Sequence, residues 1–144
     1  MQKIKNICIS TERGPKKEVD EIILIAGSGI KGDIHAAPGS LRQVSFLTEA
    51  MINTVIESGL DVKPGDFGEN FIITDIDVNE IETGKMIKIG ENVVIEITLI
   101  GKECKKPCQI FYKMGRCIMP ETGIFGKVIN GGRIKVGDCY TYGQ

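Results

Sequence analysis

Short runs of alternating apolar and polar residues recur along the chain, and this pattern predicts a mainly β protein. The stretch 93–100 shows it best, because its odd positions are Val, Ile, Ile and Leu, whereas Glu96 and Thr98 would share the opposite face. Residues 22–25 are a continuous apolar run, which predicts a buried strand. The sequence Asn-Gly-Gly at 130–132 predicts a hairpin-type turn between two strands. The predicted strands are residues 3–10, 18–25, 43–46, 71–74, 86–89, 93–100, 123–129, 133–136 and 138–142.

One clear helix is predicted from about Thr48 to Ser58. Thr48 is a suitable N-cap, Glu49 complements the positive end of the helix dipole, and Gly59 can end the helix. Apolar residues at 47, 51 and 55, with a neighbouring row at 52 and 56, predict a stripe that faces the core. Together the elements predict a β-rich fold with short helices, arranged as a closed or nearly closed β-barrel.

Length and composition indicate one domain, residues 1–144, with 42% hydrophobic and 26% charged residues. A formal net charge of −1 gives no general attraction to nucleic acid or to an anionic membrane. No apolar run approaches the roughly 20 residues that cross a bilayer, and the N-terminus lacks the apolar core of a signal peptide. We therefore expect a cytoplasmic protein with no membrane or nucleic-acid partner.

The chain has five cysteines, and in the cytoplasm we expect them to be reduced. Cys8 and Cys139 fall inside predicted strands and are interpreted as packing residues. The segment 101–108 directly follows the best predicted strand and places three lysines close to Cys104 and Cys108. A nearby ammonium group favours the thiolate, and Cys108 would begin a predicted short helix at 109–114. Cys108 is therefore the leading candidate for a reactive sulfur.

Two simpler interpretations of these cysteines remain open. Most cytosolic cysteines are small buried apolar residues, and the lysines could form a solvated face. A structural zinc site could use Cys104, Cys108 and Cys117 with His35 as a distant fourth ligand. The C-x3-C spacing has no second paired-cysteine knuckle, so the sequence indicates zinc only weakly.

Several polar residues in glycine-containing loops could bind a ligand. Asp33 and His35 form one neighbourhood, and Glu69 and Asn70 form another. Arg42 comes directly before a predicted strand, and its planar guanidinium suits a phosphate or another oxyanion. Each has an alternative as an ordinary surface or loop-stabilising residue. The sequence has no phosphate-binding P-loop, no G-x-G-x-x-G that opens a helix, no H-E-x-x-H and no G-x-S-x-G motif.

Taken in order, a series of segments resembles the MOSC domain, the family named for the C-terminal domain of molybdenum-cofactor sulfurase. The resemblance covers nearly the whole chain and is closest to small stand-alone bacterial members. The matching segments are Gly-Asp-Ile-His at 32–35, Arg-Gln-Val-Ser at 42–45, residues 64–70, residues 84–90, Lys-Pro-Cys at 106–108, residues 123–128 and residues 131–138.

This resemblance implies a MOSC-type β-barrel that binds the molybdenum cofactor, a molybdopterin, or carries sulfur on a cysteine. By position, Cys108 would be the thiolate that ligates molybdenum or holds a persulfide. Asp33, His35, Arg42, Glu69, Asn70 and Lys106 would contact the cofactor. A sulfur donor protein, a reductase or a molybdoenzyme acceptor would be the partner.

Three functions follow from the resemblance and stay open at this point. The first is a cofactor or sulfur carrier, and the second is a molybdenum-dependent reductase of N-hydroxylated compounds that needs a separate reductase. The third is a non-catalytic binding or assembly module with structural cysteines. Whether the protein is an enzyme is therefore not decided by its sequence.

Overall fold

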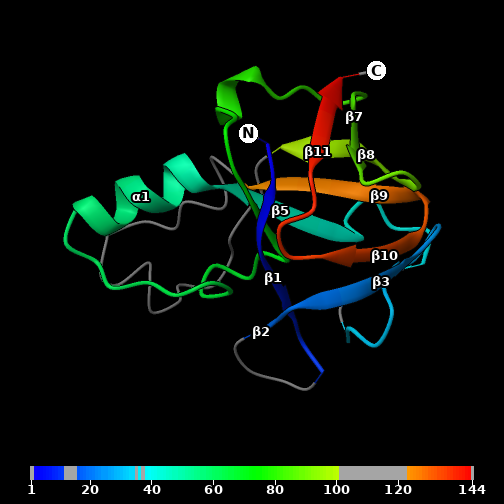
Figure 1. Ribbon diagram of the computed structural model, residues 1–144, viewed down its shortest axis with the longest axis horizontal. Helices are drawn as coiled ribbons and strands as arrows, with labels where there is room; N and C mark the ends of the chain where they lie inside the picture. Colours follow the sequence, from blue (N-terminus) through cyan, green and yellow to red (C-terminus); the bar gives the residue numbers. More distant parts are fainter. Residues whose placement is uncertain (1, 12–15, 35, 37, 101–122, 144) are drawn as a thin grey trace.

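The chain folds as a mainly β protein, as the sequence pattern predicts, and its strongly curled eight-stranded sheet forms a half-barrel (Figure 1). The structure is a computed structural model that describes residues 2–11, 16–34, 36, 38–100 and 123–143. Its elements are β1 (Ile4–Ile9), β2 (Lys17–Val19), β3 (Glu21–Ile25), β4 (Gly29–Ile30), β5 (Val44–Thr48), α1 (Glu49–Glu57), β6 (Phe71–Ile73), the 3-10 turn η1 (Val78–Glu80), β7 (Met86–Ile89), β8 (Val93–Ile100), β9 (Ile124–Asn130), β10 (Gly132–Lys135) and β11 (Tyr140–Gly143).

The large sheet has the order β11-β7-β8-β9-β5-β6-β1-β2. Its neighbours pair antiparallel except β5 and β6, which run parallel and are connected through α1. A single bridge between Lys3 and Cys139 joins the chain before β1 to the chain before β11, so the curled sheet nearly meets itself. The concave side encloses a core of branched aliphatic residues, with Phe46 and Phe71 stacked at 5.1 Å between ring centroids.

A second sheet of three strands, in the order β10-β3-β4, covers one side of the half-barrel, where β3 and β10 lie side by side below β9 in Figure 1. The prediction of one strand over 18–25 is therefore wrong. The chain bends at Asp20, so β2 belongs to the large sheet and β3 to the second sheet. The expected burial of 22–25 is also wrong. Ile22 and Leu24 are buried, but Ile23 and Ile25 are 41% and 44% exposed, because one face of this small sheet is open to solvent.

The Asn-Gly-Gly turn at 130–132 does not make a hairpin, contrary to the prediction. β9 pairs with β8 and β5, whereas β10 pairs with β3 in the other sheet. The turn is a corner between the two sheets. Gly131 is required there because an added Cβ would lie 2.3 Å from the carbonyl oxygen of Leu24.

Helix α1 begins and ends where the capping signals predict. The hydroxyl of Thr48 accepts a hydrogen bond from the backbone N–H of Met51 at 3.3 Å. Val55 is fully buried in a small cluster with Leu47 and Phe67, but Ile56 is 47% exposed, so the apolar stripe is narrower than predicted. In the part of the chain that the structure describes, no helix is long and apolar enough to cross a membrane.

Candidate functional site

A polar pocket lies where the chain enters β5, beside the residues that lead into β6 and the start of β9. Its volume is about 320 Å³. Because the parallel strands β5 and β6 start at the same end of the sheet, the loops that precede them meet there. The lining residues are Lys16, Arg42, Gln43, Val44, Ser45, Gly68, Asn70 and Phe125.

Asn70 ties three separate segments together behind this pocket. Its side-chain amide donates to the backbone oxygen of Cys8 at 3.1 Å and to the carboxylate of Asp33 at 3.3 Å. Its side-chain oxygen accepts from the backbone N–H of Ser45 at 3.0 Å. The side chains of Cys8, Asp33 and Ser45, like that of Asn70, are buried. Buried polar groups that are fully hydrogen-bonded hold one geometry, so this network fixes one wall of the pocket.

Lys16 is a nearly buried cation of the same network. Its side chain is 8% exposed, and its ammonium lies 3.7 Å from an oxygen of Asp33 and 3.4 Å from the hydroxyl of Ser10. Burial lowers the pKa of Lys16, and the neighbouring Asp33 carboxylate opposes that effect. Lys16 could not be recognised from the sequence, because a lysine in a polar loop carries no local signal of burial. Only the fold brings it to Asp33.

Arg42 supplies a second positive charge at the exposed rim. Its guanidinium carbon lies 5.6 Å from the centre of the Phe125 ring, which is a cation–π arrangement. The next residue is fixed firmly, because the Gln43 side chain donates to the oxygen of Gly27 and accepts from the N–H of Val128, both at 2.9 Å. The backbone of Arg42 is therefore held in place just before β5, and its guanidinium lies over the ring of Phe125.

Glu69 is fully buried and shapes the loop beside the pocket. Its two carboxylate oxygens accept hydrogen bonds from the backbone N–H groups of Gly65 at 2.8 Å and Phe67 at 3.2 Å. Burial raises the pKa of Glu69, and these hydrogen bonds oppose the increase. Its carboxylate is not among the groups that line the pocket, so its visible contacts are those of a loop-stabilising residue.

Comparisons with known proteins identify the family. The family model for the MOSC domain matches residues 31–141. The chain belongs to the MOSC family. Solved MOSC relatives have the same fold: the YuaD protein from Bacillus subtilis has a TM-score of 0.81 at 18% identity, with 100% of this chain and 97% of that chain covered. YiiM from Geobacillus stearothermophilus has a TM-score of 0.72 at 14% identity, covering 100% and 76%.

YiiM from Escherichia coli has a TM-score of 0.66 at 17% identity, with 96% of this chain and 69% of that chain covered. A search of curated proteins found no match. At these identities the structural likeness shows a shared MOSC fold.

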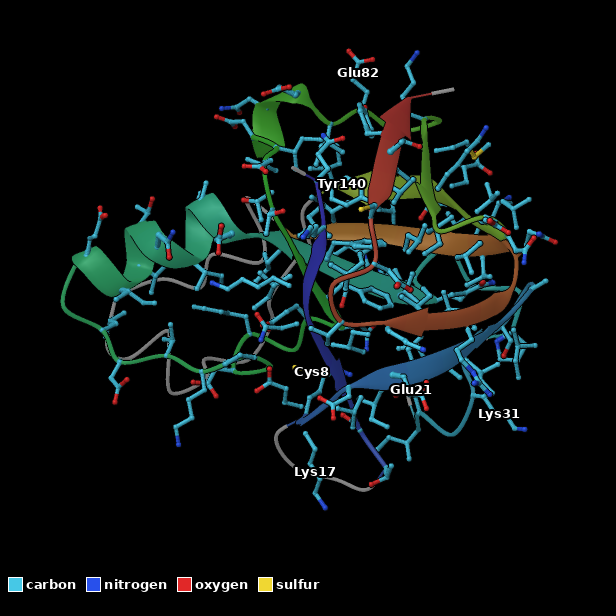
Figure 2. All side chains as sticks on the ribbon, viewed as in Figure 1. Cys8, Lys17, Glu21, Lys31, Glu82 and Tyr140 are labelled. Atoms are coloured by element: carbon cyan, nitrogen blue, oxygen red, sulfur yellow. The ribbon has the colours of Figure 1, made fainter. Side chains whose placement is uncertain are left out.

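The described cysteines of this MOSC chain differ in environment. Cys8, on β1 (Figure 2), is 1% exposed, and burial raises its pKa to about 12, so it is a packing thiol as predicted. Cys139 is exposed, which corrects the expectation that it packs inside a strand. Among the described residues there is no group of three or more His, Cys, Asp or Glu side chains that could hold a metal ion.

The remaining predicted site residues of the MOSC chain lie outside the described residues: His35, Cys104, Lys106, Cys108 and Cys117. The strands on either side of segment 101–122 are described. Ile100 at the end of β8 and Ile124 at the start of β9 are register partners. Phe125, which lines the pocket, follows immediately. Of the predicted residues that are described, Arg42 and Asn70 meet at the pocket, and Asp33 adjoins it through Asn70.

Proposed function

We propose that this protein holds the molybdenum cofactor, with the anionic end of the cofactor in the pocket between Arg42 and Lys16. The observation that carries the proposal is the pairing of an exposed guanidinium with a nearly buried ammonium in one cavity. Membership of the MOSC family supplies the class of ligand. A carrier of cofactor or sulfur is the function that we favour.

The pocket residues fit a phosphate-bearing ligand. Arg42 can donate two parallel hydrogen bonds to phosphate oxygens. Lys16 contributes a charge from the pocket wall, where low exposure reduces screening by water. Asp33 partly neutralises that ammonium, which favours a ligand of moderate negative charge.

Ser45 and Asn70 position these charges. The Ser45 hydroxyl lies 3.3 Å from the backbone oxygen of Gly68 and 3.1 Å from the N–H of Asn70, so the two loop ends are joined across the pocket floor. A pocket that is rigid before the ligand arrives loses less conformational entropy on binding. The network around Asn70 therefore favours binding even where it does not touch the ligand.

We assign the thiolate role to Cys108. The bound cofactor would supply the molybdenum and its redox chemistry, and the cysteine would ligate the metal or carry a sulfane sulfur. Soft thiolates suit molybdenum, and the lysines at 102, 105 and 106 favour the ionised thiol. Cys8 does not suit this role, because its raised pKa keeps it a thiol.

The test is anaerobic loading with molybdenum cofactor followed by metal analysis. Wild type should retain molybdenum near one equivalent, Cys108→Ser should lose it, and Arg42→Gln should reduce it severalfold. Cys104→Ser and Cys117→Ser are the matched cysteine controls, and Lys88→Gln removes an exposed cation on β7, away from the pocket. We expect all three controls to load like wild type.

A second measurement separates the pocket from the thiolate. Pyrophosphate titrated into ¹⁵N-labelled protein should shift the amide signals of Ser45, Gly68 and Asn70 in wild type and in Cys108→Ser, but much less in Arg42→Gln. Equal loading of wild type, Cys108→Ser and Arg42→Gln would contradict the proposal. Retention of molybdenum with turnover of an N-hydroxylated compound would favour the reductase over the carrier.

A further inference from the structure

The open face of the three-stranded sheet carries a row of two cations with an isoleucine between them. Ile23 on β3 is directly opposite Arg133 on β10. On its other side the N–H of Lys31 donates to the oxygen of Ile23 at 2.8 Å, which continues the ladder beyond β4. All three side chains are exposed. Because adjacent strands are about 4.8 Å apart, the two basic residues stand about 10 Å apart across the sheet.

A hollow of about 270 Å³ lies on this row. Its walls are Ile9, Ile22 and Ile23, together with the charged residues Glu21, Lys31 and Arg133. Glu21 lies 4.0 Å from the Arg133 guanidinium, and it faces Lys135 in the β3–β10 register. Figure 2 shows Glu21 and Lys31 along the β3 side of the molecule. The hollow therefore has an aliphatic floor with charged groups at its border.

The charge of this face differs from that of the chain as a whole. The formal net charge of the protein is −1, but the row across β4, β3 and β10 and the adjoining Glu21–Lys135 pair contain three cations and one carboxylate. A local positive area on a slightly negative protein orients an acidic partner during encounter. Exposed isoleucines give that partner apolar surface to cover once it has docked.

We propose that this face, defined by Glu21, Ile23, Lys31, Arg133 and Lys135, docks an acidic segment of a partner protein. The segment carries an aliphatic side chain over Ile23 and carboxylates toward Lys31 and Arg133. In an extended segment, side chains two residues apart share a face, so acidic residues two positions before and two positions after one aliphatic residue flank it on the same side. Their backbones are about 13 Å apart, and the long side chains of Lys31 and Arg133, about 10 Å apart across the sheet, can reach them. Glu21 disfavours nucleic acid more than a protein segment, because a protein segment can place an uncharged residue beside this carboxylate, whereas every nucleotide brings a phosphate.

This docking face is separate from the pocket of Arg42. The hollow and the pocket share no lining residue. A partner on the docking face would therefore leave the pocket open. A partner that delivers a ligand to the pocket, or receives one from it, needs the pocket to stay open. The inference goes beyond the proposed cofactor function, and its test is made on the protein without cofactor.

The probe is a short fluorescein-labelled peptide in which one Leu is flanked on each side by two Glu. We expect saturable binding with a dissociation constant below about 1 mM at low salt, and weaker binding as salt increases. The double variant Lys31→Gln/Arg133→Gln should bind about tenfold more weakly, because two charge contacts are lost. Backbone amide shifts should map to β3, β10 and Lys31.

The controls are matched in charge and in shape. Lys63→Gln/Lys88→Gln removes two exposed cations from other surfaces and should bind the peptide like wild type. A peptide with Gln in place of Glu tests charge, and one with Ser in place of Leu tests the aliphatic floor; both should bind several times more weakly. Because the substituted residues are exposed, the variants should fold, which circular dichroism verifies.

Four results would overturn the proposal. One is the absence of saturable binding, and another is equal binding by the Lys31/Arg133 double variant. The third is a set of amide shifts at Ser45 and Asn70 rather than on β3, which would assign the peptide to the pocket. Tighter binding of a single-stranded oligonucleotide than of the peptide would likewise overturn the proposal, because it would identify nucleic acid as the partner of this face.

Discussion

The side-chain amide of Asn70 donates to the carboxylate of Asp33 across 37 residues of sequence, at 3.3 Å. We expect Asn70→Asp to destabilise the protein by about 2–4 kcal/mol, because it removes buried donors and puts a second carboxylate beside Asp33. Urea denaturation measures the change. The same substitution at exposed Asn92 should cost less than about 0.5 kcal/mol. Equal losses at both positions would show that the network around Asn70 adds little.

The free energy of unfolding should depend on pH through the buried carboxyl group of Glu69. Burial raises the pKa of Glu69 in the folded protein above its ordinary value, so the folded state holds this proton more tightly than the unfolded state. The stabilising contribution of the protonated Glu69 to the free energy of unfolding is therefore fully present below pH 4.5, and it is lost as the pH rises through the pKa of Glu69 in the folded protein. Wild type should gain stability relative to Glu69→Gln as the pH falls from 7 toward 4.5. Denaturation of both proteins over this range tests the sign, with Glu57→Gln on exposed α1 as the control for lost charge.

The two described cysteines should react very differently with iodoacetamide. With a pKa of about 12, the Cys8 thiol is ionised to only about one part in 10⁴ at pH 8, and it is also inaccessible. Exposed Cys139 should be alkylated long before Cys8 in native protein, as peptide mass spectrometry would show. In guanidinium the two should react at similar rates. Comparable labelling in the native state would contradict the burial of Cys8.

Gly131→Ala should destabilise the protein by about 2–4 kcal/mol, because the new methyl group would overlap the Leu24 carbonyl oxygen. Gly137→Ala is the informative control. Gly137 has open space around it but a φ of +93°, so its substitution introduces only backbone strain of about 1 kcal/mol. Thermal unfolding separates the two. A smaller loss of stability for Gly131→Ala than for Gly137→Ala would mean that the backbone at the corner between the sheets can shift to accommodate a methyl group.

Local pattern was sufficient for elements with one buried face. Strand β8 was predicted at its observed bounds, Val93–Ile100, because alternation in sequence directly reflects a half-buried strand. The helix was predicted from its cap, because Thr48 acts on the nearest N–H groups. Which strands pair is a longer-range property. Without it, the residues at 130–132 look the same whether they close a hairpin or turn between sheets.

The candidate site was predicted only in part for the same reason. Arg42 and Asn70 stood out as polar residues beside predicted strands, and both line the pocket. Lys16 was missed because its role depends on Asp33, from a different loop. Residues 22–25 were predicted to be buried because they are all aliphatic, yet the alternate exposure of Ile23 creates the face that we propose for docking.

The parallel pairing of β5 and β6 has a consequence for folding kinetics. Two antiparallel strands can pair through a tight turn, but a parallel pair requires its whole connection, here α1 and the loop that follows, to be in place. Pairing at this sequence separation is slow, because loop-closure entropy is lost before the contacts form. Ser45 and Asn70 flank this pair, so the pocket is assembled only when the connection has closed. Anion binding there should therefore not appear during refolding before β5 and β6 have paired.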